Sequence, residues 1–152
     1  MTRPLPAPDD RALPEDPDLV SRTAPTGRIV AAVSAGGAIG ALARYQVGRG
    51  WPVPAAGFPW STLVVNVSGC LLIGVLLSVL SARPGAHPLF RPFLGTGVLG
   101  GYTTFSTYTV DLHRLLTTGH PATAASYLAG TLVAALAATA LGMQLGGRVA
   151  RR

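Results

Sequence analysis

The side chains that could carry chemistry in this 152-residue chain are amides, hydroxyls and aromatic rings, and very few are acidic. Only 18 residues are charged, and beyond Arg28 a single carboxylate, Asp111, remains. Paired-carboxylate glycosidases and carboxylate-bridged metal sites both need at least two converging acids. Cys70 is the sole cysteine, so it offers neither a disulfide nor zinc-type spacing. The composition therefore excludes the common acid–base enzymes, and we expect no enzymatic activity.

Hydrogen-bond donors gather instead within long uncharged stretches. Thr62 and Asn66 lie one helical turn apart, and Tyr127 and Thr131 repeat that spacing further along the chain. Further donors and ring edges cluster in one short run, formed by Thr104, Phe105, Ser106, Thr107 and Tyr108. Hydroxyls, an amide and electropositive ring edges without carboxylates favour a small, strongly hydrogen-bonding anion over a cation or a proton relay.

Several of these polar residues also have a structural interpretation. Asn66 could join two helices through its amide, and Tyr127 could anchor the chain at the membrane interface. Arg44, near the end of the first apolar stretch, could reach the lipid headgroups or hold a positive potential at the mouth of a pore. The residues alone leave these alternatives open.

The elements that must position these residues are membrane-length apolar segments. A bilayer core of about 30 Å needs a helix of about 20 residues, and the candidate segments are residues 29–48, 60–82, 89–116 and 121–147. The chain has no Lys, and its 12 basic residues are Arg at the edges of uncharged stretches, which is typical of a membrane protein rather than of a nucleic-acid-binding surface. We therefore predict an all-α integral membrane protein, with a four-helix membrane domain at residues 28–152 and a disordered, Pro-rich tail at residues 1–27.

The third of these segments has an unusual centre. Residues 95–109 hold four Gly and five Thr, which weakens a regular helix through backbone entropy and β-branching. We therefore expect the third helix to be broken at its centre. Where a membrane helix unwinds, its carbonyls can bind a cation, and such backbone is tolerated only inside protein or beside water. Residues 100–104 should therefore be central and functional.

Small residues recur at every fourth position on two of the segments. On the first they are Ala32, Gly36 and Gly40. On the fourth they are Ser126, Gly130, Ala134, Ala138, Gly142 and Gly146. Such a series lets another backbone approach closely, so we expect both to be packing faces.

Three stretches together resemble the CrcB/Fluc family of fluoride channels. They are GGAIGALARY at residues 36–45, STLVVNVSG at residues 61–69 and GVLGGYTTFSTYTVD at residues 97–111. The resemblance covers essentially everything beyond residue 28, and it implies an antiparallel, dual-topology dimer with two fluoride pores. It also implies a structural sodium ion (Na+) on the dimer axis, held by the backbone carbonyls of Gly100 and Thr103. The function it implies is passive, fluoride-selective efflux through the cell membrane, which gives fluoride resistance.

The resemblance and the pattern of donors together assign residues to the fluoride path. These are Asn66, Phe105, Tyr108, Ser106, Thr107, Tyr127, Thr131 and Thr62, with Arg44 at the vestibule. Tyr108 departs from the family pattern, which commonly has Phe there. Ala135, one turn beyond Thr131, replaces a frequent Ser, so the track of hydroxyls is expected to end early.

A small dual-topology multidrug exporter of four helices is the alternative of another class. Its proton-coupled forms are expected to carry a membrane-embedded carboxylate, usually in the first helix, where this chain has none. Asp111 lies next to His113 and Arg114, and we expect it to pair with them near the interface. A passive scaffold protein, the third possibility, would conduct no ions.

The arginines indicate an orientation. With four crossings, nine of the 12 Arg fall on the side of both termini, and only Arg44, Arg49 and Arg114 fall on the other. This bias predicts cytoplasmic termini. A chain that inserts both ways should be nearly balanced, so the dimer partner could be an identical copy or an oppositely oriented paralogue. The expected partners are thus fluoride, membrane lipid and a second subunit, and not nucleic acid.

Overall fold

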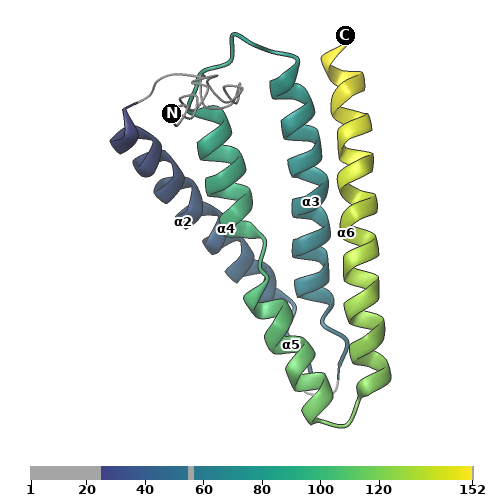
Figure 1. Ribbon diagram of the computed structural model, residues 1–152. Coiled ribbons are helices and arrows are strands. Elements are labelled where there is room, and N and C mark those ends of the chain that lie inside the picture. Colours follow the sequence, from purple (N-terminus) through teal and green to yellow (C-terminus); the bar gives the residue numbers. More distant parts are fainter. Residues whose placement is uncertain (1–24, 55–56, 152) are drawn as a thin grey trace, which may run out of the picture.

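The computed structural model describes residues 25–54 and 57–151, and every regular element within them is helical (Figure 1). The helices are α2 (Thr26–Gly50), α3 (Trp60–Ser81), η1 (Arg91–Leu99), α4 (Gly100–Tyr102), α5 (Ser106–Thr117) and α6 (Pro121–Ala150). The tail expected at residues 1–27 lies almost wholly outside the described residues, and α2 begins at Thr26, three residues before the expected start. The all-α fold class is confirmed for the described part of the chain.

Three helices are long and apolar enough to cross a membrane. They are α2, α3 and α6, with 25, 22 and 30 residues. At about 1.5 Å per residue even α3 reaches about 33 Å, slightly more than a bilayer core of about 30 Å. These helices coincide with the first, second and fourth predicted segments, so the prediction of those three is confirmed.

The third predicted segment consists of three helical pieces. η1 is a nine-residue π-helix, and the N–H of Gly100 at its end bonds to the Gly95 carbonyl five residues earlier. α4 adds only three residues, and α5 begins at Ser106. Between them Thr103 has extended backbone, with φ −74° and ψ 159°, which a helix does not accommodate. We call residues 103–105 the link.

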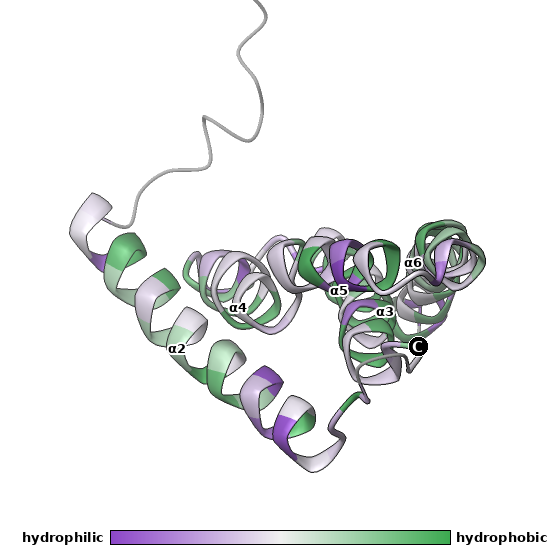
Figure 2. Ribbon diagram, turned by 90° about the horizontal axis from the view of Figure 1, so that it is seen from below, coloured by the Kyte–Doolittle hydropathy of each residue, from purple (hydrophilic) through white to green (hydrophobic). Residues whose placement is uncertain are grey.

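Glycines on α2 let η1 and α4 approach to backbone contact (Figure 2). A Cβ on Gly40 would collide with the Val98 carbonyl and lie 2.7 Å from the Tyr102 nitrogen. A Cβ on Gly36 would collide with the Phe93 carbonyl. Only glycine fits at these two positions, so the packing face predicted on the first segment is confirmed.

α6 packs against α3 along only part of its series of small residues. Gly142 abuts the Leu71 carbonyl, and a Cβ on Gly146 would lie 2.7 Å from the Val75 carbonyl. Gly130 has nothing within 4 Å of where its Cβ would be. A strict four-residue spacing drifts by about 40° per step on a helix of 3.6 residues per turn. The drift turns the N-terminal end of the series away from α3, so the prediction of one continuous face is wrong at that end.

The start of α2 and the end of α6 lie at the same end of the bundle (Figure 1). Near the opposite end, Leu115 of α5 and Ala124 and Tyr127 of α6 form a small core in which each is at most 1% exposed. Phe58, which precedes α3, packs against it. This core holds α5 against α6, and it brings the ring of Tyr108 to 5.1 Å from that of Tyr127.

Candidate functional site

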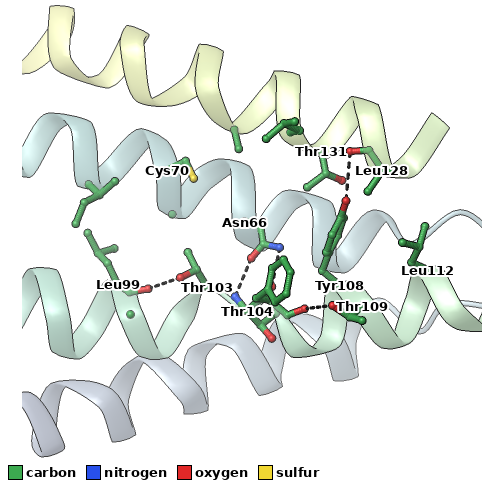
Figure 3. A pocket seen from close by; sticks show the side chains of 16 residues that line it. Asn66, Cys70, Leu99, Thr103, Thr104, Tyr108, Thr109, Leu112, Leu128 and Thr131 are labelled. Carbon is green, nitrogen blue, oxygen red and sulfur yellow. Dashed lines mark hydrogen bonds between the residues drawn. The ribbon is translucent and has the colours of Figure 1, made fainter. Parts of the chain in front are cut away.

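Asn66 on α3 forms a two-bond pair with the backbone of Thr104 in the link (Figure 3). Its Nδ2 donates to the Thr104 carbonyl at 2.9 Å, and the Thr104 N–H donates to its Oδ1 at 2.8 Å. The side chain thus replaces partners that a regular helix would have supplied to Thr104. An amide nitrogen carries two hydrogens, so one Nδ2 donor is still available. Asn66 does join two segments, and its place on an ion path remains a prediction.

The same pair changes which carbonyls have helical partners. In a regular helix the Gly100 carbonyl would accept from the Thr104 N–H, and the Thr103 carbonyl from the Thr107 N–H. Here the Thr104 N–H bonds to Asn66, and the Thr107 N–H bonds to the Thr104 hydroxyl at 3.1 Å. Both carbonyls that the resemblance assigns to a cation have therefore lost their usual donor. Carbonyl oxygens are ligands that hard cations prefer.

Thr104 also organises the start of α5. Its Oγ1 accepts from the Thr107 N–H, which satisfies one of the unpaired amides of the first turn. The same oxygen lies 3.1 Å from the Thr107 Oγ1 and 3.2 Å from the Ser106 Oγ. The three hydroxyls therefore form one cluster, with Thr104 buried at its centre. The sequence counted Thr104 as one hydroxyl among several and did not predict its pairing with Asn66, which lies 38 residues away in the chain.

A cavity of about 730 Å³ opens beside the link, and we call it the inner cavity. Its wall brings together six predicted residues, namely Asn66, Gly100, Thr103, Phe105, Tyr108 and Thr131. Phe105 is 80% exposed, and its ring centroid lies 5.8 Å from that of Tyr108. Ala135 lines the same cavity, so the expected end of the hydroxyl track falls on its wall.

Tyr127 and Thr131 on α6 are buried, and neither hydroxyl has a hydrogen-bond partner among the described residues. Tyr127 is fully covered, so its interpretation as an interface anchor is wrong. The Tyr108 hydroxyl, in contrast, donates to the Leu128 carbonyl at 3.3 Å (Figure 3). Buried hydroxyls without partners are costly. Such groups are candidates to bind a hydrogen-bonding ligand.

A second cavity, of about 610 Å³, holds most of the remaining predicted residues, and we call it the outer cavity. Arg44 and Arg49 of α2 line it together with Thr62, Thr104 and Thr107. Thr104 lines both cavities, so the link borders the inner cavity as well as the outer one. The two groups of site residues meet at Thr104, whereas the predicted residues Ser106 and Tyr127 line neither of these two cavities.

The Thr62 hydroxyl is already engaged as a donor. Its Oγ1 donates to Asp111 Oδ2 at 2.7 Å, so it can offer only lone pairs to another group. Asp111 also pairs with Arg114 at 3.4 Å, and the Arg114 Nη1 donates to the Pro54 carbonyl at 2.8 Å. The expected pairing of Asp111 with Arg114 is confirmed, whereas Thr62 rather than His113 is its other described partner. The Thr62 proton is thus engaged, and the place of Thr62 on the ion path stays a prediction.

These features define a helical, multi-pass membrane protein whose polar groups converge on an interrupted segment. The sequence profile of the family described as CrcB-like protein, Camphor Resistance (CrcB), matches residues 31–143. The chain belongs to this family.

The chain is also similar to individual relatives. It is 56% identical over 104 residues to fluoride-specific ion channel FluC 2 of Streptomyces avermitilis, and the match covers 68% of this chain and 66% of that protein. It is 51% identical over 121 residues to fluoride-specific ion channel FluC 1 of Streptomyces coelicolor, covering 80% and 79% of the two chains. It is 44% identical over 119 residues to fluoride-specific ion channel FluC of Nitrobacter winogradskyi, covering 76% and 93%. The relatives are named as ion channels and not as enzymes, in agreement with the expectation from composition.

Proposed function

We propose that this chain is a subunit of a fluoride-selective channel, which lets fluoride leave the cell passively and so gives fluoride resistance. The observation that carries the proposal is the inner cavity, where the unpartnered hydroxyl of Thr131 shares a wall with Asn66 and Phe105. The described lining of this cavity contains no carboxylate that would repel an anion. The names of the relatives support fluoride as that anion.

The two cavities suggest an order of events for the ion. Arg44 and Arg49 give the outer cavity a positive potential that attracts an anion from water. At the link, the Thr107 hydroxyl and the remaining Nδ2 hydrogen of Asn66 replace part of the hydration shell of fluoride. In the inner cavity the electropositive edge of Phe105 and the Thr131 hydroxyl replace the rest. The gradient of fluoride alone drives the passage.

In this proposal η1, α4 and α5 together make the third membrane crossing, and the link is the break at its centre. Non-helical backbone at membrane depth is tolerated only when protein or water satisfies it. Asn66 satisfies the Thr104 amide, and the inner cavity borders all three residues of the link.

The Gly100 and Thr103 carbonyls fit a structural sodium ion. Both residues line the inner cavity, and the N–H groups that would normally bond to these carbonyls bond elsewhere. Two oxygens are too few for a hard cation, so a second subunit has to contribute the same pair. The ion then supplies a positive charge that holds the carbonyls of two subunits together.

An antiparallel dimer is the assembly that completes this site. A single chain leaves Phe105 80% exposed beside the inner cavity, and within a bilayer close packing of side chains, rather than removal from water, favours covering it. In a two-fold symmetric pair each subunit covers this face of the other. The same dimer therefore both completes the cation site and covers the Phe105 ring.

The orientation follows from the arginines. Arg28, Arg83, Arg91 and Arg148 belong to the bundle end where α2 begins and α6 ends (Figure 1). We place this end in the cytoplasm. The partner is then a copy or a paralogue that inserts the other way. Purification of the chain expressed alone separates the two cases. If only monomer is found, the partner is a paralogue. A stable, conducting homodimer would show that no paralogue is needed.

Fluoride efflux from liposomes that contain the purified chain, followed with a fluoride electrode, tests the function. If no homodimer forms, the candidate paralogue is reconstituted with it. We expect rapid fluoride efflux and no comparable chloride efflux. No ion flux would indicate a scaffold. Transport of cationic compounds that depends on protonation of Asp111 would support the exporter, although this carboxylate is bonded to Thr62 and Arg114.

A further inference from the structure

The thiol of Cys70 is a reactive group that the proposed path does not yet use. Cys70 is the sole cysteine of the chain, and it lies on the wall of the inner cavity. It follows Asn66 by four residues on α3, so the two lie on the same face of that helix, one turn apart (Figure 3). Its side chain is partly exposed, and its sulfur makes no hydrogen bond with another described residue. The thiol can therefore donate to whatever enters the cavity.

Most other hydroxyls on this wall are already engaged as donors. The Tyr108 hydroxyl donates to a carbonyl of α6, and those of Thr103 and Thr109 each donate to the carbonyl four residues earlier in the chain. The Thr104 hydroxyl is held within its cluster of three hydroxyls. Since a hydroxyl carries a single hydrogen, these four groups have no proton to give to an anion.

Three side-chain donors remain on the described wall of the inner cavity. They are the second Nδ2 hydrogen of Asn66, the hydroxyl of Thr131 and the thiol of Cys70. Thr131 is only 7% exposed and its hydroxyl has no partner among the described residues, which independently indicates a hydrogen-bonding ligand in this cavity. On α6 the donors end there, because Ala135 follows one turn later and offers none. On α3 they continue to Cys70.

We propose that Cys70 is a further residue of the fluoride path, whose thiol donates to the ion beyond Asn66 and Thr131, so that a small group attached to its sulfur blocks the channel. The inference rests on the proposed channel function. Ile73, three residues further on α3, and Leu132 of α6 also line the cavity, but as apolar residues they give a dehydrated anion nothing in place of water. The thiol therefore extends the series of donors along α3 by one helical turn.

A matched pair of variants tests the donor, because a cysteine can also act as a small apolar residue. Cys70→Ala and Cys70→Ser have side chains of similar size, and only the second offers a hydrogen-bond donor. Fluoride efflux from liposomes should be several-fold slower in Cys70→Ala than in Cys70→Ser, and thermal unfolding checks that both variants are folded. Equal efflux rates in the two variants would overturn the proposal.

Reversible modification of the full chain tests whether the sulfur faces the path. Methyl methanethiosulfonate transfers its methylthio group to the Cys70 thiolate and releases methanesulfinate, while the thiol proton passes to the buffer. We expect the completed reaction, followed by mass spectrometry of the intact chain, to lower fluoride efflux about tenfold or more. Dithiothreitol should restore efflux, because thiol–disulfide exchange releases methanethiol, regenerates the Cys70 thiol and oxidises the reagent to its cyclic disulfide. If a paralogue is needed for conduction, its cysteines are first replaced by Ser.

Ser126→Cys in the Cys70→Ser background is the control for the modification. Ser126 is exposed on α6 and lines neither the inner nor the outer cavity. A methylthio group there should therefore leave the efflux of that variant as it was before the reaction. Unchanged efflux after complete modification of Cys70, or an equal loss in the control, would overturn the proposal.

Protection by fluoride separates this inference from the proposed function. Fluoride in the inner cavity should slow the modification of Cys70 several-fold, as measured by mass spectrometry, and chloride should not. If the unmodified chain carries no fluoride flux, the proposed function fails, and the rate of this reaction alone then decides whether Cys70 contacts the ion. An identical rate with and without fluoride would overturn the proposal.

Discussion

Replacement of Asn66 by Leu removes both hydrogen bonds to the link and introduces no charge. The Thr104 N–H and carbonyl then lose partners at 2.8 and 2.9 Å. Each buried polar group left unsatisfied costs about 1–3 kcal/mol, so the gross loss is about 2–6 kcal/mol. If the Thr104 N–H returns to the Gly100 carbonyl, a helical bond worth about 1 kcal/mol is regained. We expect a net loss of about 1–5 kcal/mol in the free energy of unfolding.

Thermal unfolding in detergent measures this loss, and fluoride efflux is recorded in parallel. At about 2–4 °C per kcal/mol, Tm should fall by roughly 10 °C. Efflux should fall at least tenfold, because the link no longer keeps its shape. Ser78→Ala is the matched control on the same helix, since the Ser78 hydroxyl also makes a bond to another segment, the Met143 carbonyl at 3.0 Å. It should cost about 1 kcal/mol or less and leave efflux normal.

Asn66→Asp separates the structural role from the conducting one. The Asp side chain keeps an oxygen for the Thr104 N–H but places negative charge on the path, so we expect loss of efflux with the dimer retained. Normal efflux in Asn66→Asp would remove this side chain from the ion path. An unchanged Tm in Asn66→Leu would refute the reasoning that the amide holds the link.

Three further changes test other parts of the structure. Thr131→Val removes the unpartnered hydroxyl of the inner cavity and should slow fluoride efflux from liposomes several-fold. Thr139→Val is the control and should leave efflux unchanged, because the Thr139 hydroxyl already donates to the carbonyl four residues earlier in α6. Equal efflux rates in the two variants would contradict the role of Thr131. Gly40→Ala should cost about 1–3 kcal/mol in thermal unfolding through overpacking, while Gly48→Ala, with open space around its Cβ position, should be neutral or slightly stabilising. Exchange of Na+ for a large organic cation should lower the Tm of the dimer, and a Tm independent of Na+ would contradict the cation site.

Much of the fold could be predicted because the signals are local. A bilayer imposes a minimum helix length and excludes charge, so composition alone located α2, α3 and α6. The spacing of Gly36 and Gly40 located a packing face because three or four residues separate neighbours on a helix surface. The same rule failed at Gly130, since a four-residue spacing is not the true period of the helix and the error accumulates with length.

The details of the site could not be predicted from spacing. The sequence placed Thr62 on the ion path but gave no sign that its proton goes to Asp111, which lies 49 residues further along the chain. Thr104 was counted as one donor among several, although its backbone receives the Asn66 side chain. Hydrogen bonds between residues so far apart in the chain depend on how the helices pack, so a local sequence pattern does not predict them.

The sequence by itself determined that the chain is helical, membrane-embedded and nearly free of acids beyond its first residues, because these properties follow from composition and from the length of each apolar run. It also marked a stretch rich in Gly and Thr as unsuited to a regular helix. Only the tertiary structure decided which groups in that stretch are engaged. The Asn66 side chain takes the Thr104 N–H and the Thr104 hydroxyl takes the Thr107 N–H, so two backbone carbonyls lose their helical donors. A hydrogen-bond donor can be engaged only where folding brings an acceptor within about 3 Å.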